Sequence, residues 1–206
     1  MDTPRFFPAT TMPDRGWWAA VWPDPEDTVR SLGVEPEMTV LDLCCGDGYF
    51  TAPLARIVRG HAYAVDIDPA MLEETRAELK RTGATVLDLI CADARDLPAL
   101  LPVKVDYVLI ANTFHGVPDK TGMARAVAAV LNPGGRFAVV NWHPLPREQT
   151  VVLDKPRGPK TEMRMSSDDV RLAVEPAGFA LERVVELPPF HYGAIFQVTH
   201  TDVGRA

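Results

Sequence analysis

Residues 40–50 constrain the fold of this chain more than any other segment. They read Val-Leu-Asp-Leu-Cys-Cys-Gly-Asp-Gly-Tyr-Phe, an apolar run that contains one acid, Asp42, and continues into a loop of small residues. Gly46 and Gly48 allow the backbone to approach a ligand closely, and a helix that follows offers N–H groups to a carboxylate or phosphate. Asp42 is placed to accept hydrogen bonds from an amino group. A βαβ unit holds the polar end of a nucleotide-like cofactor in this way.

Strand-like and helix-like segments alternate along the rest of the chain. The alternating pattern predicts parallel strands at 38–43, 61–66, 84–91, 104–110 and 135–141 and helices at 48–59, 69–81 and 120–131. The residues between 144 and 164 are rich in proline and are predicted to form a long loop, followed by a helix near 168–176 that Ser166 or Ser167 caps. Two further strands, 179–187 and 191–199, are separated by a short turn and are predicted to be antiparallel neighbours. We therefore expect an α/β fold: a seven-stranded Rossmann-like sheet, mostly parallel, with an antiparallel C-terminal strand and helices on both faces.

Length and composition limit the function classes. The 206 residues suit one domain, expected at 37–206, after an N-terminal aromatic-rich cap at 1–36. The net charge of −7 argues against nucleic acid as the main partner, and no apolar run is long enough for a membrane span. Three poorly spaced cysteines and the lack of a signal-peptide pattern favour reduced thiols in the cytoplasm. No residues show metal-ligand spacing, so no metal is expected.

A second acid ends the next predicted strand, 61–66. Asp66 lies about 20 residues beyond the first loop, where a doubly wound fold places the acid that binds ribose hydroxyls. Ile67 is placed to pack on a base. Asp68 precedes a proline and is better explained as a helix cap. Asp93, after the third strand, would accept from an exocyclic amino group or lie in a solvated loop.

Four motifs occur in order along the chain: Val-Leu-Asp-Leu-Cys-Cys-Gly-Asp-Gly at 40–48, Val-Asp-Ile-Asp-Pro-Ala-Met-Leu at 65–72, Ala-Asp-Ala-Arg-Asp-Leu-Pro at 92–98 and Leu-Asn-Pro-Gly-Gly-Arg-Phe at 131–137. In these motifs and in their order, the sequence resembles the class I S-adenosylmethionine-dependent methyltransferases over about residues 30–199. Residues 105–119 also match the family's fourth-strand region. The resemblance implies that the chain is an enzyme, with S-adenosylmethionine as methyl donor and a small molecule as acceptor.

The resemblance also implies a cofactor site, residue by residue. One position departs from the pattern, because Cys44 stands where many members have the first glycine. A cysteine fits there if its φ is negative. The implied contacts are with the methionine end for Asp42, Cys44, Gly46 and Gly48, with the nucleoside for Asp66, Ile67, Asp93 and Ala94, and with the sulfonium side for Asn112.

The acceptor is expected beyond the carboxyl ends of the fourth and fifth strands. His115 and His143 are candidates for a general base or for a residue that orients the acceptor, and a loop histidine bonded to backbone is the equally open alternative. His143 is preferred, because it follows the fifth strand directly. Trp142 precedes it, and the resemblance implies that Trp17 or Trp18 covers the pocket.

The segment 144–164 carries a local charge of +2 in an otherwise acidic chain. A solvated loop face is one interpretation. The other is a cover over the acceptor in which Arg157 and Lys160 favour an anionic group.

Three other functions stay open at this point. A nicotinamide-dependent oxidoreductase also uses an acid after the second strand, but the third glycine of its phosphate fingerprint is missing here. A nucleic-acid or protein methyltransferase, or a cofactor-binding protein without catalysis, would share the same motifs. The oligomeric state is not predicted.

Overall fold

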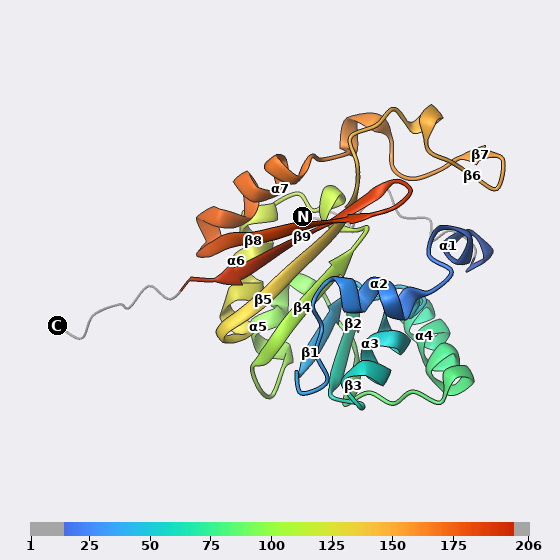
Figure 1. The fold of residues 1–206 in the computed structure, drawn as a ribbon. Helices are drawn as coiled ribbons and strands as arrows, with labels where there is room; N and C mark the ends of the chain where they lie inside the picture. The colour runs from blue at the N-terminus through green and yellow to red at the C-terminus, as the bar shows by residue number, and fades with distance from the viewer. Residues whose placement is uncertain (1–14, 200–206) are drawn as a thin grey trace, which may run out of the picture.

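A computed structural model describes residues 15–199 of the chain, and residues 1–14 of the predicted cap lie outside this range (Figure 1). The centre is a seven-stranded sheet in the order β3-β2-β1-β4-β5-β9-β8. Its strands are Val40–Leu43 (β1), Ala62–Asp66 (β2), Asp88–Cys91 (β3), Val105–Ala111 (β4), Leu131–Trp142 (β5), Phe179–Leu187 (β8) and His191–Val198 (β9).

The strand directions confirm the predicted fold class. β1 to β5 are parallel to one another, while β9 is antiparallel to both β5 and β8. The strand order reverses between β1 and β4, and sheets of this kind bind ligands outside the carboxyl ends of the strands at such a point.

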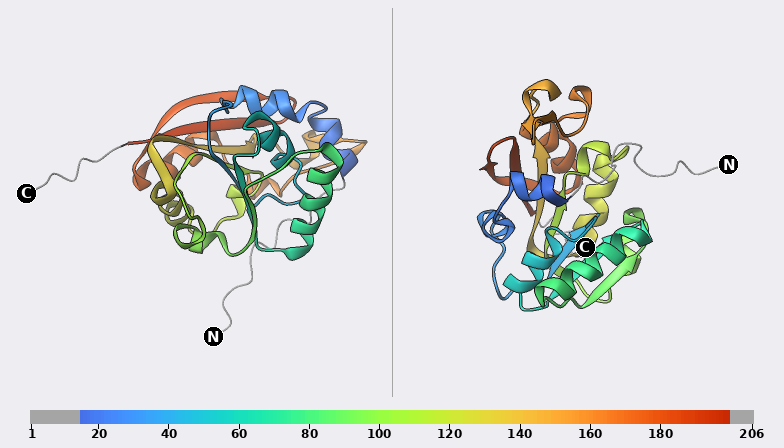
Figure 2. Two further views of the ribbon diagram at one scale, coloured as in Figure 1. Left: turned by 90° about the horizontal axis from the view of Figure 1, so that it is seen from below. Right: turned by 90° about the vertical axis from the view of Figure 1, so that its right-hand side faces the viewer.

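Helices cover both faces of the sheet, as predicted (Figure 2). The side chains of β1 alternate between the two layers: Val40 packs with the layer of α2 and α3, and Leu41 and Leu43 pack with that of α5, α6 and α7. Leu41 and Leu43 are completely buried, and each contributes about 1.5–3 kcal/mol of burial free energy. The helices are Arg15–Val21 (α1), Pro25–Ser31 (α2), Thr51–Ile57 (α3), Pro69–Thr82 (α4), Leu97–Leu100 (α5), Lys120–Val130 (α6) and Ser167–Val174 (α7).

Local sequence signals set several helix ends. Asp68 caps α4 through the N–H of Ala70, and Pro69 occupies the first turn. Ser166 forms a capping box with Asp169 at the start of α7. The sequence had left Ser166 and Ser167 as alternatives, and the structure selects Ser166.

Two segments differ from the sequence-based expectation. The glycine turn before the fifth strand lies inside β5, because Val105 pairs with Leu131 while Tyr107 pairs with Arg136. Gly134, at φ +75°, absorbs the extra residues of this irregularity. The predicted long loop at 144–164 also contains regular structure: the short strands Val151–Val152 (β6) and Lys155–Pro156 (β7) and the 3₁₀ turns Arg147–Gln149 (η3) and Thr161–Met163 (η4).

Aromatic side chains attach the N-terminal helices to the sheet. His191 of β9 is completely buried between two indoles, 4.4 Å from Trp22 and 4.0 Å from Trp142 between ring centroids. Neither of its ring nitrogens has a hydrogen-bond partner within residues 15–199. Burial, together with the positive charges of His143 and Arg164, lowers the pKa of His191 well below its ordinary value.

Within residues 15–199, no helix has the length and apolar character needed to cross a bilayer. The same residues contain no group of three His, Cys, Asp or Glu side chains arranged for a metal ion.

The His191→Phe variant tests this buried imidazole. The unfolded chain binds a proton at His191 below about pH 6.5, while the folded protein does not, so folding stability falls as the pH decreases through that value. The expected loss from this group is about 1.4 kcal/mol per pH unit. Urea denaturation at about pH 7.5 and about pH 5 should therefore show a smaller pH dependence in His191→Phe than in the wild type. An identical pH dependence in the two proteins would contradict the prediction.

Candidate functional site

A cavity of about 800 Å³ opens at the carboxyl ends of β1, β2, β4 and β5. One side is formed by the loop after β1 and the starts of the segments after β2, β3 and β4. The opposite side is formed by α1, the end of β5 and part of the segment 147–159. The volume lies in the upper part of the range for small-molecule sites, about 300–1,000 Å³, and so leaves room for a cofactor and a small acceptor.

Most of the residues predicted from the sequence line this cavity. Four do not: Gly48, Asp93, His143 and Lys160. The twelve on its wall are Trp17, Trp18, Asp42, Cys44, Gly46, Asp66, Ile67, Ala94, Asn112, His115, Trp142 and Arg157.

The loop after β1 turns through left-handed backbone. Cys44 has φ +60° and Gly46 has φ +57°, so the condition of a negative φ at Cys44 is not met, and the cysteine takes the left-handed conformation of the glycine that it replaces. Gly48, at φ +79°, contacts α4 instead of the cavity: a Cβ there would lie 2.9 Å from Thr75 Cα. Thr75 also donates to the Gly46 carbonyl at 2.8 Å, which fixes the loop against α4. The second glycine of the motif therefore serves packing.

Substitutions at Cys44 test the left-handed turn. A glycine has no Cβ penalty at this φ, so Cys44→Gly should keep or raise the free energy of unfolding, by up to about 1 kcal/mol. A β-branched residue is least tolerated there, so Cys44→Val should lose about 2 kcal/mol. Urea denaturation of both variants measures the difference, and equal stability of the two would contradict the left-handed assignment.

Two carboxylates lie on the wall beside this loop. Asp42 is buried and accepts a hydrogen bond from the Thr51 hydroxyl at 2.6 Å; burial raises its pKa to about 7, although that bond opposes the shift. Asp66 accepts from the N–H groups of Gly46 and Asp68, both at 2.9 Å, and burial raises its pKa as well. A cationic ligand would stabilise the ionised form of both groups.

The neighbouring thiols are not activated. Burial is the main cause that raises the pKa of Cys44 and of Cys45, and the negative charges of Asp66 and Asp42 add to it. Both side chains are therefore neutral thiols at physiological pH, without the thiolate that nucleophilic chemistry needs.

The segment after β3 contacts the cavity through Ala92 and Ala94. Asp93 has a different position: its carboxylate accepts from the Arg95 backbone N–H at 2.9 Å and forms an ion pair with the Arg95 guanidinium at 2.6 Å. This ion pair lowers the pKa of Asp93. Ile67 also lines the cavity; its side chain is 44% exposed and offers an apolar surface to a planar ring.

Unpartnered polar atoms gather where β4 and β5 end. Asn112 is a second non-glycine residue with a left-handed backbone, at φ +56°, and its buried Oδ1 has no hydrogen-bond partner within residues 15–199. The buried Nδ1 of His115 lacks one as well. Buried polar atoms are nearly always hydrogen-bonded, so these groups indicate a site for a polar ligand. Burial lowers the pKa of His115, which keeps its imidazole neutral at physiological pH.

The preferred histidine of the sequence, His143, lies away from this wall. Its Nε2 is 2.9 Å from Glu186 Oε2, and its ring packs 5.3 Å from that of Tyr192. Lys160 is also turned to solvent, with Nζ 3.9 Å from Glu162. The chain turns at Pro144 directly after β5, so position 143 does not continue along the cavity.

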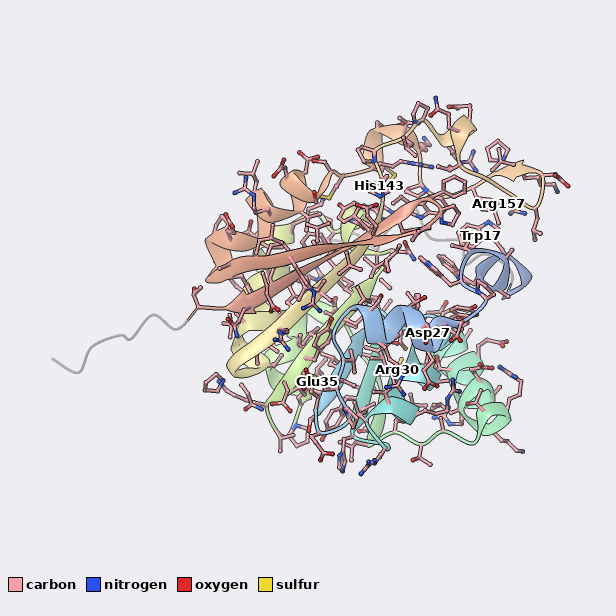
Figure 3. The ribbon with its side chains drawn as sticks, in the orientation of Figure 1. Trp17, Asp27, Arg30, Glu35, His143 and Arg157 are labelled. Carbon is pink, nitrogen blue, oxygen red and sulfur yellow. The ribbon has the colours of Figure 1, made fainter. Side chains whose placement is uncertain are left out.

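Aromatic and basic side chains form the other half of the cavity. Trp17 lies 5.7 Å from Trp142, and Arg157 lies near Trp17 at the meeting point of α1 and the hairpin of β6 and β7 (Figure 3). The sequence reasoning did not single out Arg147 or Tyr49, which also line the cavity. The excess of positive charge in the segment was the only signal for Arg147, and Tyr49 was assigned to a helix.

Comparisons with known proteins agree with this geometry. A family model described as a methyltransferase domain matches residues 40–135. The demethylmenaquinone methyltransferase of Listeria welshimeri is 30% identical over 118 residues, 56% of this chain and 50% of that protein. The ubiquinone/menaquinone biosynthesis C-methyltransferase of Shewanella woodyi is 34% identical over 118 residues, 56% of this chain and 47% of that protein. The chain thus matches about half the length of these relatives.

A similar fold occurs in solved structures. A SAM-dependent methyltransferase from Aquifex aeolicus superposes with a TM-score of 0.74 at 23% identity, over 90% of this chain and 94% of that one. The magnesium protoporphyrin IX methyltransferase of Synechocystis PCC 6803, solved with bound SAM, gives a TM-score of 0.63 at 15% identity, over 92% and 87% of the two chains.

Proposed function

Since this chain belongs to the class I S-adenosylmethionine-dependent methyltransferases, we propose that it transfers the methyl group of S-adenosylmethionine to a small molecule held in the same cavity. The observation that carries the proposal is a pair of buried polar atoms on the cavity wall, Asn112 Oδ1 and His115 Nδ1, that have no hydrogen-bond partner within residues 15–199. The names of the two curated relatives refer to quinone-type small molecules, which supports an acceptor of that size.

The residues of the acidic half fit the cofactor. S-adenosylmethionine supplies a methyl carbon made electrophilic by a sulfonium. Asp42 and Asp66 provide negative charge on the wall, and the left-handed loop at Cys44 and Gly46 keeps backbone close to the cavity. Ile67 and Ala94 provide apolar surface for a planar ring. We assign these residues, with Asn112, to cofactor binding.

His115 is the residue that we assign to the reacting end of the acceptor. It lines the cavity, it is neutral, and its Nδ1 has no partner in the described chain, so it can accept a proton from the acceptor. A base is needed only when the acceptor carries a proton on its reacting atom. Otherwise the imidazole orients the acceptor by hydrogen bonding.

We further propose that the N-terminal region acts as a cap. Trp17 and Trp18 of α1 lie on the cavity wall, and the Tyr49 hydroxyl donates to the Trp22 carbonyl at 2.5 Å. This bond joins the segment after α1 to the end of the cofactor loop, so closure over both ligands would exclude water.

An Asp66→Asn variant tests the cofactor assignment. The amide keeps the shape of the side chain but loses the charge and one acceptor for ribose hydroxyls, so the Kd for S-adenosylhomocysteine should rise about tenfold or more. Isothermal titration calorimetry measures this change. Asp96→Asn, at an exposed acid in the 3₁₀ turn after β3, is the control and should bind like the wild type. Equal affinity in the Asp66 variant would contradict the assignment.

A His115→Gln variant tests the reacting end. Methyl transfer, measured as S-adenosylhomocysteine released with an acceptor found by a metabolite screen, should fall about 100-fold in kcat if the imidazole removes a proton. The wild-type kcat should then decrease toward acidic pH, because protonation of His115 removes the base. Since the pKa of His115 is lowered, this decrease should begin below its ordinary value. An unchanged kcat in His115→Gln would exclude proton removal by His115, and an unchanged KM for the acceptor in His115→Ala would exclude the orienting role.

A further inference from the structure

We propose that the acceptor is a planar aromatic compound with an oxyanion group, its ring packed against Trp17 and Trp142 and its oxyanion bound by Arg147 and Arg157. This inference rests on the proposed function, because it identifies the acceptor class of the same cavity. The family match ends at residue 135, so none of these four residues lies within the matched segment.

Charge is divided across the cavity. The acids on the wall, Asp42 and Asp66 among them, lie at the ends of β1 and β2, on the side that we assign to the cofactor. The arginines on the wall, Arg147 and Arg157, come from the segment after β5. A cationic donor and an anionic acceptor would each meet charge of the opposite sign, and the two partners would be oriented toward each other.

The two guanidinium groups are held by the backbone of their own segment. Arg147 Nε donates to the Gly158 carbonyl at 3.1 Å, and Arg157 Nε donates to the Val152 carbonyl at 3.4 Å. Within residues 15–199, no carboxylate lies within 4.0 Å of either group. Each arginine thus has its position fixed while its outer N–H groups are not used by an acid, which suits the binding of a carboxylate or phosphate.

A third arginine supports this arrangement from behind. Arg164 is only 7% exposed, and its Nη2 donates to Thr150 Oγ1 at 2.8 Å and to the Arg157 carbonyl at 2.9 Å. Its guanidinium also lies 5.0 Å from the centre of the Trp142 ring. Arg164 is therefore a positioning residue: it fixes the backbone of Arg157 and connects the segment to the aromatic wall.

The aromatic surface and the cations belong to one unit. Gly158, directly after Arg157, packs so closely on Trp142 that a Cβ there would lie 2.7 Å from the ring atom Cε2. Trp142 in turn lies 5.7 Å from Trp17 at an interplanar angle of 59°. A ring in contact with these indoles would therefore carry its substituent next to Arg157. Aromatic packing alone would accept any flat molecule, and the arginines restrict it to an anionic one.

The test uses ligand probes and two variants. Binding is followed by tryptophan fluorescence in the full chain saturated with S-adenosylhomocysteine. The probes are 2-naphthoate and 2-naphthyl phosphate as aromatic oxyanions, 2-naphthamide as the neutral match, and cyclohexanecarboxylate as the non-aromatic anion. The variants are Arg147→Gln and Arg157→Gln. Lys155→Gln, an exposed residue of the same segment, is the matched control for loss of charge.

At least one aromatic oxyanion should bind about tenfold or more tightly than both 2-naphthamide and cyclohexanecarboxylate. The stronger of the two identifies carboxylate or phosphate. Each arginine variant should bind the stronger oxyanion about tenfold more weakly than the wild type and should bind 2-naphthamide with unchanged affinity, while Lys155→Gln should behave like the wild type. Because 2-naphthamide binding needs an intact aromatic wall, a variant that fails to fold is recognised by the loss of 2-naphthamide binding.

Three results would overturn the inference: no oxyanion bound at about 1 mM, neither 2-naphthoate nor 2-naphthyl phosphate bound more tightly than 2-naphthamide, or arginine variants with unchanged affinity for the stronger oxyanion. The proposed function fails separately. If S-adenosylhomocysteine itself does not bind, the methyltransferase assignment is wrong. If it binds and the probes do not discriminate, only the acceptor class is wrong.

Discussion

The site depends on one backbone constraint, the left-handed turns at the carboxyl ends of β1 and β4. At the end of β1, Cys44 has φ +60°, and the next N–H, of Cys45, bonds to Val65 of β2 at 3.1 Å. At the end of β4, Asn112 has φ +56°, and its own N–H bonds to Val140 of β5 at 2.8 Å. The connections after β1 and β4 thus leave the sheet in opposite directions, and a crevice opens between them. Neither residue is glycine, so each turn has a steric cost, and such costs are concentrated at functional sites.

The two halves of the cavity form by different physical means. The cofactor side depends on local structure: Asp42 and Asp66 lie near the carboxyl ends of the neighbouring parallel strands β1 and β2, so both reach the same wall of the cavity. The acceptor side depends on tertiary contacts, because α1 and the segment after β5 both pack on Trp142 and also contact each other through β6. The family match, over residues 40–135, includes the loops of the cofactor side but not Trp142, Arg147 or Arg157.

The same difference sets what the sequence could predict. The parallel and antiparallel strand directions follow from the alternation of strands and helices, and the cap of α4 follows from Asp68, whose partner is two positions away; both predictions were correct. The position of His143 could not be derived in this way, because it depends on where the chain turns after β5 and on Glu186 in another strand. Arg147 was equally hidden, since its place on the wall depends on Gly158, eleven residues further on. The sequence marked Cys44 as irregular but left the sign of its φ open, because a loop motif does not reveal that sign when glycine is replaced.

The buried arginine behind the wall shows how the acceptor side is stabilised. Arg164 has lost most of its hydration and, within residues 15–199, has no carboxylate within 4.0 Å. Its Nη2 donates to the Thr150 hydroxyl and to the Arg157 carbonyl, and its guanidinium lies over the face of Trp142, but its buried Nη1 has no hydrogen-bond partner within the same residues. Burial lowers its pKa, and the positive charge of Arg147 adds to this effect. Three guanidinium groups in one short segment repel one another, and an oxyanion bound between Arg147 and Arg157 would relieve that repulsion. Packing of the segment against Trp142 and binding of an anionic acceptor would therefore stabilise each other. The bound acceptor would thereby form the last part of the cavity wall.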